Sequence, residues 1–181
     1  MEAVDPNAIV YPDSDGEPMA DNTLQFQWIV VLKENLDAVR PDFVAGDLLW
    51  YPVEGEPTIR RAPDVLVALG RPKGHRGSYR QWVEGQPPDV VMEVLSPKNT
   101  AMEMLRKLAF YRRHGAKEFY VVDPDEAQLE VWMDEGEGLV PLEPGDQITS
   151  PRLGITFVRN GDLSVYHADG TPFLTFGELM A

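Results

Sequence analysis

The sequence predicts an α/β fold in which helices pack on a mixed β-sheet. Residues 22–39 place apolar side chains at helical spacing, which indicates an amphipathic helix. Residues 89–122 follow the order strand, helix, strand, which is typical of a crossover between parallel strands. Residues 128–166 hold short strand-like segments separated by turns, so we expect a β-rich C-terminal extension.

The N-terminal half is expected to begin with an arm. Residues 1–20 are acidic and rich in proline, which predicts an extended arm in front of a single domain over residues 21–181. Asn22 and Thr23 offer caps to the first helix, and Pro41 ends it. The elements expected up to residue 95 are a helix over 22–39, strands over 43–51, 62–69 and 89–95, and a long loop over 71–88.

The second half has clear signals for one helix and for several strands. Thr100 and Glu103 form a capping-box pattern that starts a helix, and Gly115 follows its last residue. We therefore expect a helix over 100–114 and strands over 117–122, 128–133, 138–142, 155–157 and 163–166.

The composition is that of a globular chain with a strong negative charge. Of the 181 residues 43% are hydrophobic, which excludes wholesale disorder. Sixteen Lys and Arg against thirty Asp and Glu give a net charge of −14, which argues against a surface that is basic throughout but allows a local basic groove. The chain has no cysteine and shows neither a signal peptide nor an apolar run of about eighteen residues. We expect a cytoplasmic location without membrane contact.

Asp64 and Glu93 stand out because each is a carboxylate inside an apolar strand. A buried carboxylate without a partner costs several kcal/mol, so each needs a hydrogen bond, a cation or a raised pKa. One interpretation is structural: Asp64 caps its strand and Glu93 pairs with an arginine. The other is that adjacent strands bring both carboxylates to one point, where they hold a hard cation such as Mg²⁺.

Lys107 also has two interpretations. It lies one helical turn after Glu103, so the two residues would form an exposed ion pair worth a few tenths of a kcal/mol. It also lies at the border of the apolar face of its helix, from which it could reach toward the strand that carries Glu93.

Basic residues cluster on both sides of the strands that carry the two carboxylates. Residues 71–80 hold four basic residues and no acid, and residues 98–117 hold six against Glu103 alone. A positive rim around a carboxylate pair would suit a metal-dependent phosphodiesterase. A solvated helix face and a polar loop would give the same pattern.

Two segments of the chain resemble a known family. The first, APDVLVALG, begins at Ala62, and the second, PPDVVMEVLSPKNTAMEMLRKLAFYRRHGAKEFYVVDP, begins at Pro87. Together they resemble the Uma-type restriction endonuclease family of the PD-(D/E)XK nuclease superfamily, most strongly over 62–124 and more loosely over 20–175. The resemblance implies a restriction-endonuclease-like core, in which helices flank a central mixed sheet.

The resemblance also implies roles for individual residues. Asp64 matches the P-D element, and Glu93 matches the acid of (D/E)-x-K, whose lysine position is Leu95 in this chain. Lys107 matches a lysine that has migrated to the following helix. Asp64, Glu93 and the Val94 carbonyl would hold Mg²⁺, with Mn²⁺ as an alternative, and Lys107 would complete the catalytic set.

Further residues are implied more loosely. Glu103 and Gln25 are secondary candidates for the site. DNA is the expected substrate, and a homodimer is expected by analogy with the superfamily. The residues expected to contact nucleic acid are Arg71, Lys73, Arg76, Arg80 and Lys98.

Three functions remain open at this point. A Mg²⁺-dependent DNA endonuclease agrees with the constellation of Asp64, Glu93 and Lys107. A catalytically weak or inactive nuclease-fold protein, acting as a nucleic-acid-binding or interaction module, agrees with Leu95 at the lysine position. A structural protein with satisfied core carboxylates agrees with the net charge of −14.

Overall fold

The structure is a computed structural model that describes residues 5–181, so the first four residues of the predicted arm lie outside it. No helix among the described residues has the length and apolar character needed to cross a membrane. In chain order the elements are α1 (Thr23–Val39), β1 (Phe43–Gly46), β2 (Trp50–Tyr51), β3 (Val65–Ala68), β4 (Tyr79–Arg80), α2 (Gln81–Glu84), β5 (Val90–Val94), α3 (Ala101–His114), β6 (Glu118–Asp123), β7 (Gln128–Asp134), β8 (Leu139–Leu142), β9 (Gln147–Thr149), β10 (Thr156–Asn160), β11 (Asp162–Tyr166) and α4 (Phe176–Leu179).

A six-stranded sheet forms the centre of the molecule, with the strand order β1-β3-β5-β6-β7-β8. Strands β5 and β6 are parallel and are joined through α3, whereas the other neighbouring pairs are antiparallel. The predicted mixed sheet and the predicted crossover are therefore confirmed. Of the predicted β-rich extension, β7 and β8 join the central sheet, whereas β9, β10 and β11 form a separate three-stranded sheet in the order β11-β10-β9.

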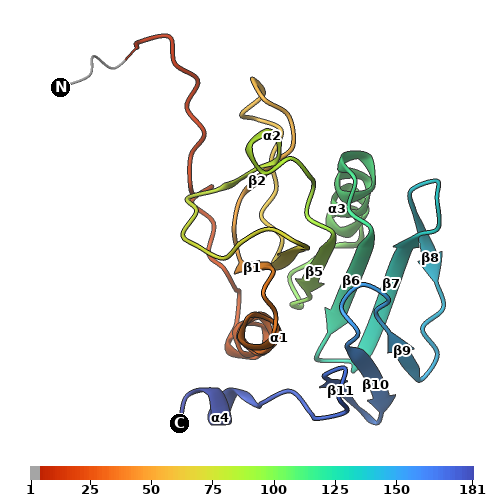
Figure 1. Ribbon diagram of the computed structural model, residues 1–181. Coiled ribbons are helices and arrows are strands. Elements are labelled where there is room, and N and C mark those ends of the chain that lie inside the picture. The colour runs from red at the N-terminus through yellow and green to blue at the C-terminus, as the bar shows by residue number, and fades with distance from the viewer. Residues whose placement is uncertain (1–4) are drawn as a thin grey trace.

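The two faces of the central sheet are covered by different elements (Figure 1). Alternate residues of β5 point to opposite faces, as strand geometry requires. Val90, Met92 and Val94 pack with α1 and the three-stranded sheet, whereas Val91 packs with Tyr111 of α3. The same alternation directs Glu93 to the face that α3 covers.

The local signals for the two long helices are present in the structure. The Asn22 side chain accepts a hydrogen bond from the Gln25 amide at 2.9 Å and caps α1. Thr100 and Glu103 form the predicted capping box of α3, and Gly115 ends that helix with a left-handed φ of 101°.

Two predicted segments differ from the structure. The strand predicted over 43–51 is interrupted at Asp47, whose φ of 48° turns the chain, so β1 and β2 belong to different sheets. Aspartate tolerates this left-handed conformation better than most residues, which is why the apolar pattern alone did not indicate the break. The loop predicted over 71–88 contains β4, which pairs with β2, and the short helix α2.

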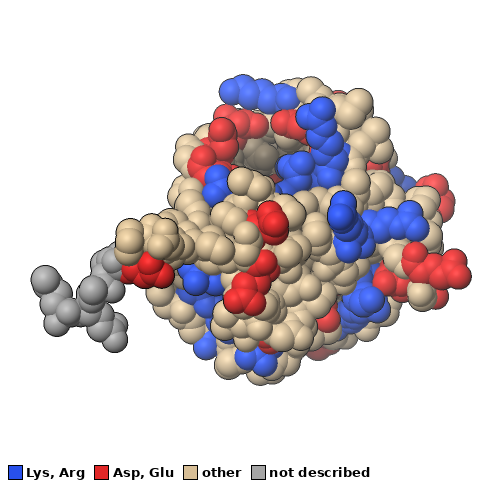
Figure 2. All heavy atoms as spheres, turned by 90° about the horizontal axis from the view of Figure 1, so that it is seen from above, with Lys and Arg blue, Asp and Glu red and all other residues tan. Residues whose placement is uncertain are grey.

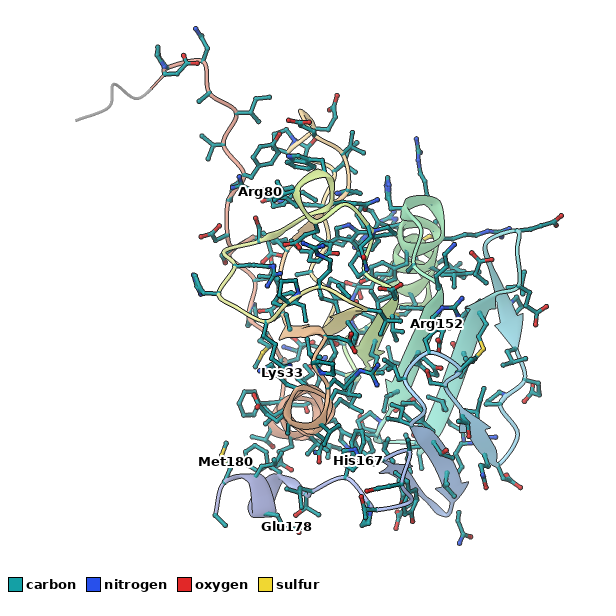
Figure 3. All side chains as sticks on the ribbon, viewed as in Figure 1. Lys33, Arg80, Arg152, His167, Glu178 and Met180 are labelled. Atoms are coloured by element: carbon teal, nitrogen blue, oxygen red, sulfur yellow. The ribbon has the colours of Figure 1, made fainter. Side chains whose placement is uncertain are left out.

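The described part of the N-terminal arm has no helix or strand and packs on the body of the molecule. The Tyr51 hydroxyl donates to the Pro12 carbonyl at 2.5 Å, and the Gly55 amide donates to the Tyr11 hydroxyl at 2.8 Å. The guanidinium of Arg80 lies 4.9 Å from the ring centre of Tyr11, beside the arm (Figure 3). These contacts fix the arm beside β2 and β4.

Glu118 connects the central sheet to the three-stranded sheet, and Arg152, one of its partners, is labelled in Figure 3. The fully buried side chain of Glu118 accepts hydrogen bonds from Tyr120 and Ser150, each at 2.5 Å. The amide of Arg152 donates to the same carboxylate at 3.1 Å. Tyr120 belongs to β6, whereas Ser150 and Arg152 belong to the segment between β9 and β10. The carboxylate therefore ties the three-stranded sheet to the central sheet.

We expect Glu118→Gln to lower the free energy of unfolding by about 2 kcal/mol, because a neutral amide cannot accept from all of these buried donors. Urea unfolding measures the change. Glu130→Gln on β7 is the matched control, since Glu130 is exposed. Equal stability of the two variants would contradict a structural role for the Glu118 carboxylate.

Candidate active site

Asp64 and Glu93 meet at the edge shared by β3 and β5. The two strands are antiparallel with Val65 opposite Met92, so the register continued by one residue sets Asp64 beside Glu93. Asp64 is 9% exposed and Glu93 is 2% exposed. Burial raises the pKa of Asp64 well above its ordinary value, and the charge of Glu93 raises it further.

Each of the two carboxylates has hydrogen-bond partners. The Val94 amide donates to Oδ2 of Asp64 at 2.7 Å. Nζ of Lys107 lies 3.1 Å from Oε2 of Glu93, and the buried Tyr111 hydroxyl donates to Oε1 of the same carboxylate. The partner of Glu93 is therefore a lysine with a tyrosine, and the alternative of an arginine partner is wrong.

Lys107 reaches over the edge of α3 to Glu93, as one of its two interpretations expects. Burial acts to lower the pKa of Lys107, but the negative charges of Glu93 and Asp64 outweigh it and the net pKa is raised. The ammonium group therefore stays protonated beside the carboxylates. Glu103 instead accepts hydrogen bonds from Asn99 and the Thr100 amide within its capping box.

Gln25 of α1 is also part of the site. Its Nε2 donates to the Val94 carbonyl at 2.7 Å, and its Oε1 accepts from the Asp21 amide at 2.7 Å. Gln25 is buried, so these bonds hold the end of β5 against the start of α1. The structure thus brings all six sequence-predicted residues of the site to one region: Gln25, Asp64, Glu93, Val94, Glu103 and Lys107.

These residues line a cavity of about 430 Å³. A hollow whose rim carries both acidic and basic side chains is visible on the face shown in Figure 2. Seven acidic residues line the cavity, namely Asp15, Glu17, Asp21, Asp47, Asp64, Glu93 and Glu103. Three basic residues line it as well, namely Arg60, Arg61 and Lys107.

Four of the residues in or beside this site were not predicted from the sequence. Tyr111 lies one helical turn after Lys107, so its spacing could have indicated a shared face of the helix. Asp47 lies within the segment 43–51 that resembled an ordinary strand, and Arg60 and Arg61 follow a turn. For these three residues no local pattern indicated that the fold directs them to the cavity.

The basic loop residues lie outside the set that lines this cavity. Arg71 and Arg76 both pair with Glu84, at 3.2 Å and 2.5 Å. Lys73 pairs with Asp37 of α1. Lys98 is exposed and is also absent from the cavity lining, as are Arg71, Lys73, Arg76 and Arg80. Their contact with nucleic acid stays a prediction.

The donors available to a metal ion are carboxylate and carbonyl oxygens. Within residues 5–181 no three side chains of His, Cys, Asp or Glu converge as a ready-made metal site. Asp64, Glu93 and the Val94 carbonyl nevertheless form the oxygen-rich set that suits Mg²⁺, which binds one or two carboxylates and keeps several waters. A cation would also relieve the repulsion that raises the pKa of Asp64.

One solved structure shares the fold of this chain. The crystal structure of "a putative nuclease belonging to DUF820" from Anabaena variabilis superposes with a TM-score of 0.51 at 18% identity, covering 86% of this chain and 77% of that one. At this identity the likeness establishes the fold alone, and it confirms the predicted fold class.

A family comparison identifies the chain more closely. The model of the Uma2 family, described as "Putative restriction endonuclease", matches residues 11–161, so the chain belongs to this family. The resemblance inferred from the sequence is thereby confirmed. No curated protein matches the chain.

Asp47 should make stability depend on pH. Its side chain is open to the solvent of the cavity. Partial burial and the negative charges of Asp15 and Glu93 nevertheless raise its pKa to about 6. The pKa of this carboxyl is higher in the folded protein than in the unfolded chain. Its contribution to stability is therefore fully present at pH values below the unfolded pKa and is lost as the pH rises through about 6. Asp47→Asn removes that loss, and asparagine also tolerates the left-handed backbone.

We expect Asp47→Asn to match the wild type near pH 4 and to be more stable near pH 7, by at most about 1 kcal/mol because solvent screens the charge. Urea unfolding with a chelator present, at several pH values, measures the difference. Asp125→Asn, at an exposed turn, removes the same charge as a control. A pH-independent difference would contradict the raised pKa.

Proposed function

We propose that this protein is a Mg²⁺-dependent endonuclease that hydrolyses phosphodiester bonds in DNA. The observation that carries the proposal is the buried pair Asp64 and Glu93 with Lys107 beside it at the base of an open cavity. Membership of a family described as "Putative restriction endonuclease" supports the general class. The metal, the DNA substrate and a homodimer that cuts two strands are part of the proposal.

The side chains have distinct roles in this proposal. Asp64, Glu93 and the Val94 carbonyl would hold the ion, which would supply Lewis-acid polarisation of the phosphodiester and a lowered pKa for a bound water. Gln25 and the Val94 amide keep these oxygens in place. Lys107 contributes a protonated ammonium group that stabilises negative charge developing on the phosphate.

A second function is favoured by one specific observation. The ammonium of Lys107 is already bound to Glu93, and Leu95 occupies the lysine position of the motif. A chain in which this ion pair persists would bind nucleic acid through the nuclease fold with weak catalysis or none. Cleavage assays separate the two functions, because only the endonuclease requires hydrolysis.

Metal binding tests the role of the carboxylates. We expect wild-type protein to bind Mg²⁺ and Mn²⁺ in calorimetric titrations, and Asp64→Asn and Glu93→Gln to lose at least about tenfold in affinity, because each removes a charged ligand. Asp125→Asn is the control for charge alone. The titration is repeated with a phosphorothioate oligonucleotide present, so that a site completed by substrate is also detected. Absence of binding in both formats would refute the metal-dependent mechanism.

A substitution of Lys107 tests catalysis separately from metal binding. We expect Lys107→Gln to lower kcat for oligonucleotide cleavage by about 100-fold or more while the affinity for Mg²⁺ is kept, because the variant loses only a charge-stabilising donor. Arg106→Gln, an exposed neighbour on α3, is the matched control. Thermal unfolding checks that both variants are folded. Unchanged kcat in Lys107→Gln would exclude this lysine from catalysis.

A further inference from the structure

We propose that Arg60 and Arg61 form a phosphate-binding pair that holds the nucleic-acid backbone in the cavity. The inference rests on the proposed nuclease function and adds a substrate contact to it. Both residues line the cavity together with Asp64 and Glu93, and neither belongs to the basic clusters at 71–80 and 98–117.

The backbone of this pair is fixed close to the carboxylates. The Trp50 amide donates to the Arg61 carbonyl at 2.8 Å, and the Arg61 amide donates to the Trp50 carbonyl at 3.2 Å. Asp64 follows only three residues later, just before β3. The arginines and the first carboxylate are therefore carried by one short, anchored segment.

Both arginine side chains are positioned by neutral groups. Nη1 of Arg60 donates to the Tyr51 hydroxyl at 3.4 Å, and the guanidinium of Arg61 lies 5.9 Å from the ring centre of Phe110. Neither forms an ion pair with any residue that the structure describes within 5–181. Their positive charges are therefore available to a ligand, whereas Arg71 and Arg76 are both paired with the carboxylate of Glu84.

Arg61 is also linked by contacts to the group that holds Glu93. It forms a backbone bridge with Trp50, whose ring stacks on Tyr111 with ring centres 6.0 Å apart. Tyr111 in turn donates to Glu93. The arginine segment and the proposed metal ligands therefore belong to one connected set of contacts.

The charge balance of the cavity favours such a pair for an anionic substrate. Seven acidic side chains line the cavity against three basic ones, and Lys107 is already paired with Glu93. Arg60 and Arg61 are the lining cations that remain for a phosphate. The guanidinium fork matches two phosphate oxygens, which favours a phosphodiester over a single point charge.

The test measures binding and cleavage on the full chain. Fluorescence anisotropy with labelled single-stranded DNA, duplex DNA and RNA of one sequence, with Ca²⁺ replacing Mg²⁺, gives affinity at several salt concentrations. Arg60→Gln and Arg61→Gln are compared with Arg113→Gln, which removes an exposed charge at the end of α3. Arg60→Lys and Arg61→Lys keep the charge but lose the fork, and they replace any glutamine variant that does not fold.

We expect each glutamine variant to bind at least about tenfold more weakly, with a salt slope less steep by about one, because each lost cation is one phosphate contact fewer. The lysine variants should recover part of the affinity, and Arg113→Gln should match the wild type. If the wild type binds and cleaves but all glutamine variants behave like Arg113→Gln, the phosphate-binding pair is refuted and the nuclease stands. If the wild type neither binds nor cleaves any of the three substrates, the proposed function fails and the pair fails with it.

Discussion

The burial of the Glu93 charge is the constraint on which the arrangement of α3 depends. Glu93 occupies the middle of β5, where the other four residues are apolar and buried. An unpartnered carboxylate at this depth would cost several kcal/mol, so the covering helix has to bring a cation or a donor to it. Helix α3 brings both, Lys107 and Tyr111, although Tyr111 is the only fully buried residue along its length. The position of the helix is therefore set by polar contacts as much as by apolar packing.

The same contacts connect the two sides of the cavity. Tyr111 stacks on Trp50, with ring centres 6.0 Å apart and planes 7° from parallel. Trp50 in turn forms the backbone bridge to Arg61. A continuous path of contacts thus leads from Glu93 on β5 through Tyr111 on α3 to the arginine segment. The groups proposed to hold the ion and the groups proposed to hold the phosphate are parts of one rigid arrangement, which a hydrolytic site needs because small displacements are costly.

The features that could be predicted from the sequence are those with a local signal. Local sequence alone indicates the capping box at Thr100 and the apolar run of β5. It also indicates Asp64 and Glu93, because each is a carboxylate within an apolar segment. The break at Asp47 could not be predicted, because a left-handed backbone is an option for aspartate and not a requirement. The pairing of loop cations could not be predicted either, since Lys73 meets Asp37 from a distant helix. The role of Arg61 depends on Trp50 and Phe110, which approach it only in the folded chain.

The negative charge of the chain is compatible with a nucleic-acid substrate when it is considered together with the cavity. The total of −14 weakens non-specific attraction to a polyanion, and the acidic cavity lining weakens entry of a phosphate further. In the proposed function, binding would depend on a few well-placed positive charges, namely the arginine pair and a divalent ion at the carboxylates. With both arginines included, the lining still has a formal excess of four negative charges, which a divalent ion would lower to two. In the proposed function substrate entry is therefore coupled to metal loading, because the ion that supports hydrolysis would also lower the electrostatic barrier to the phosphate.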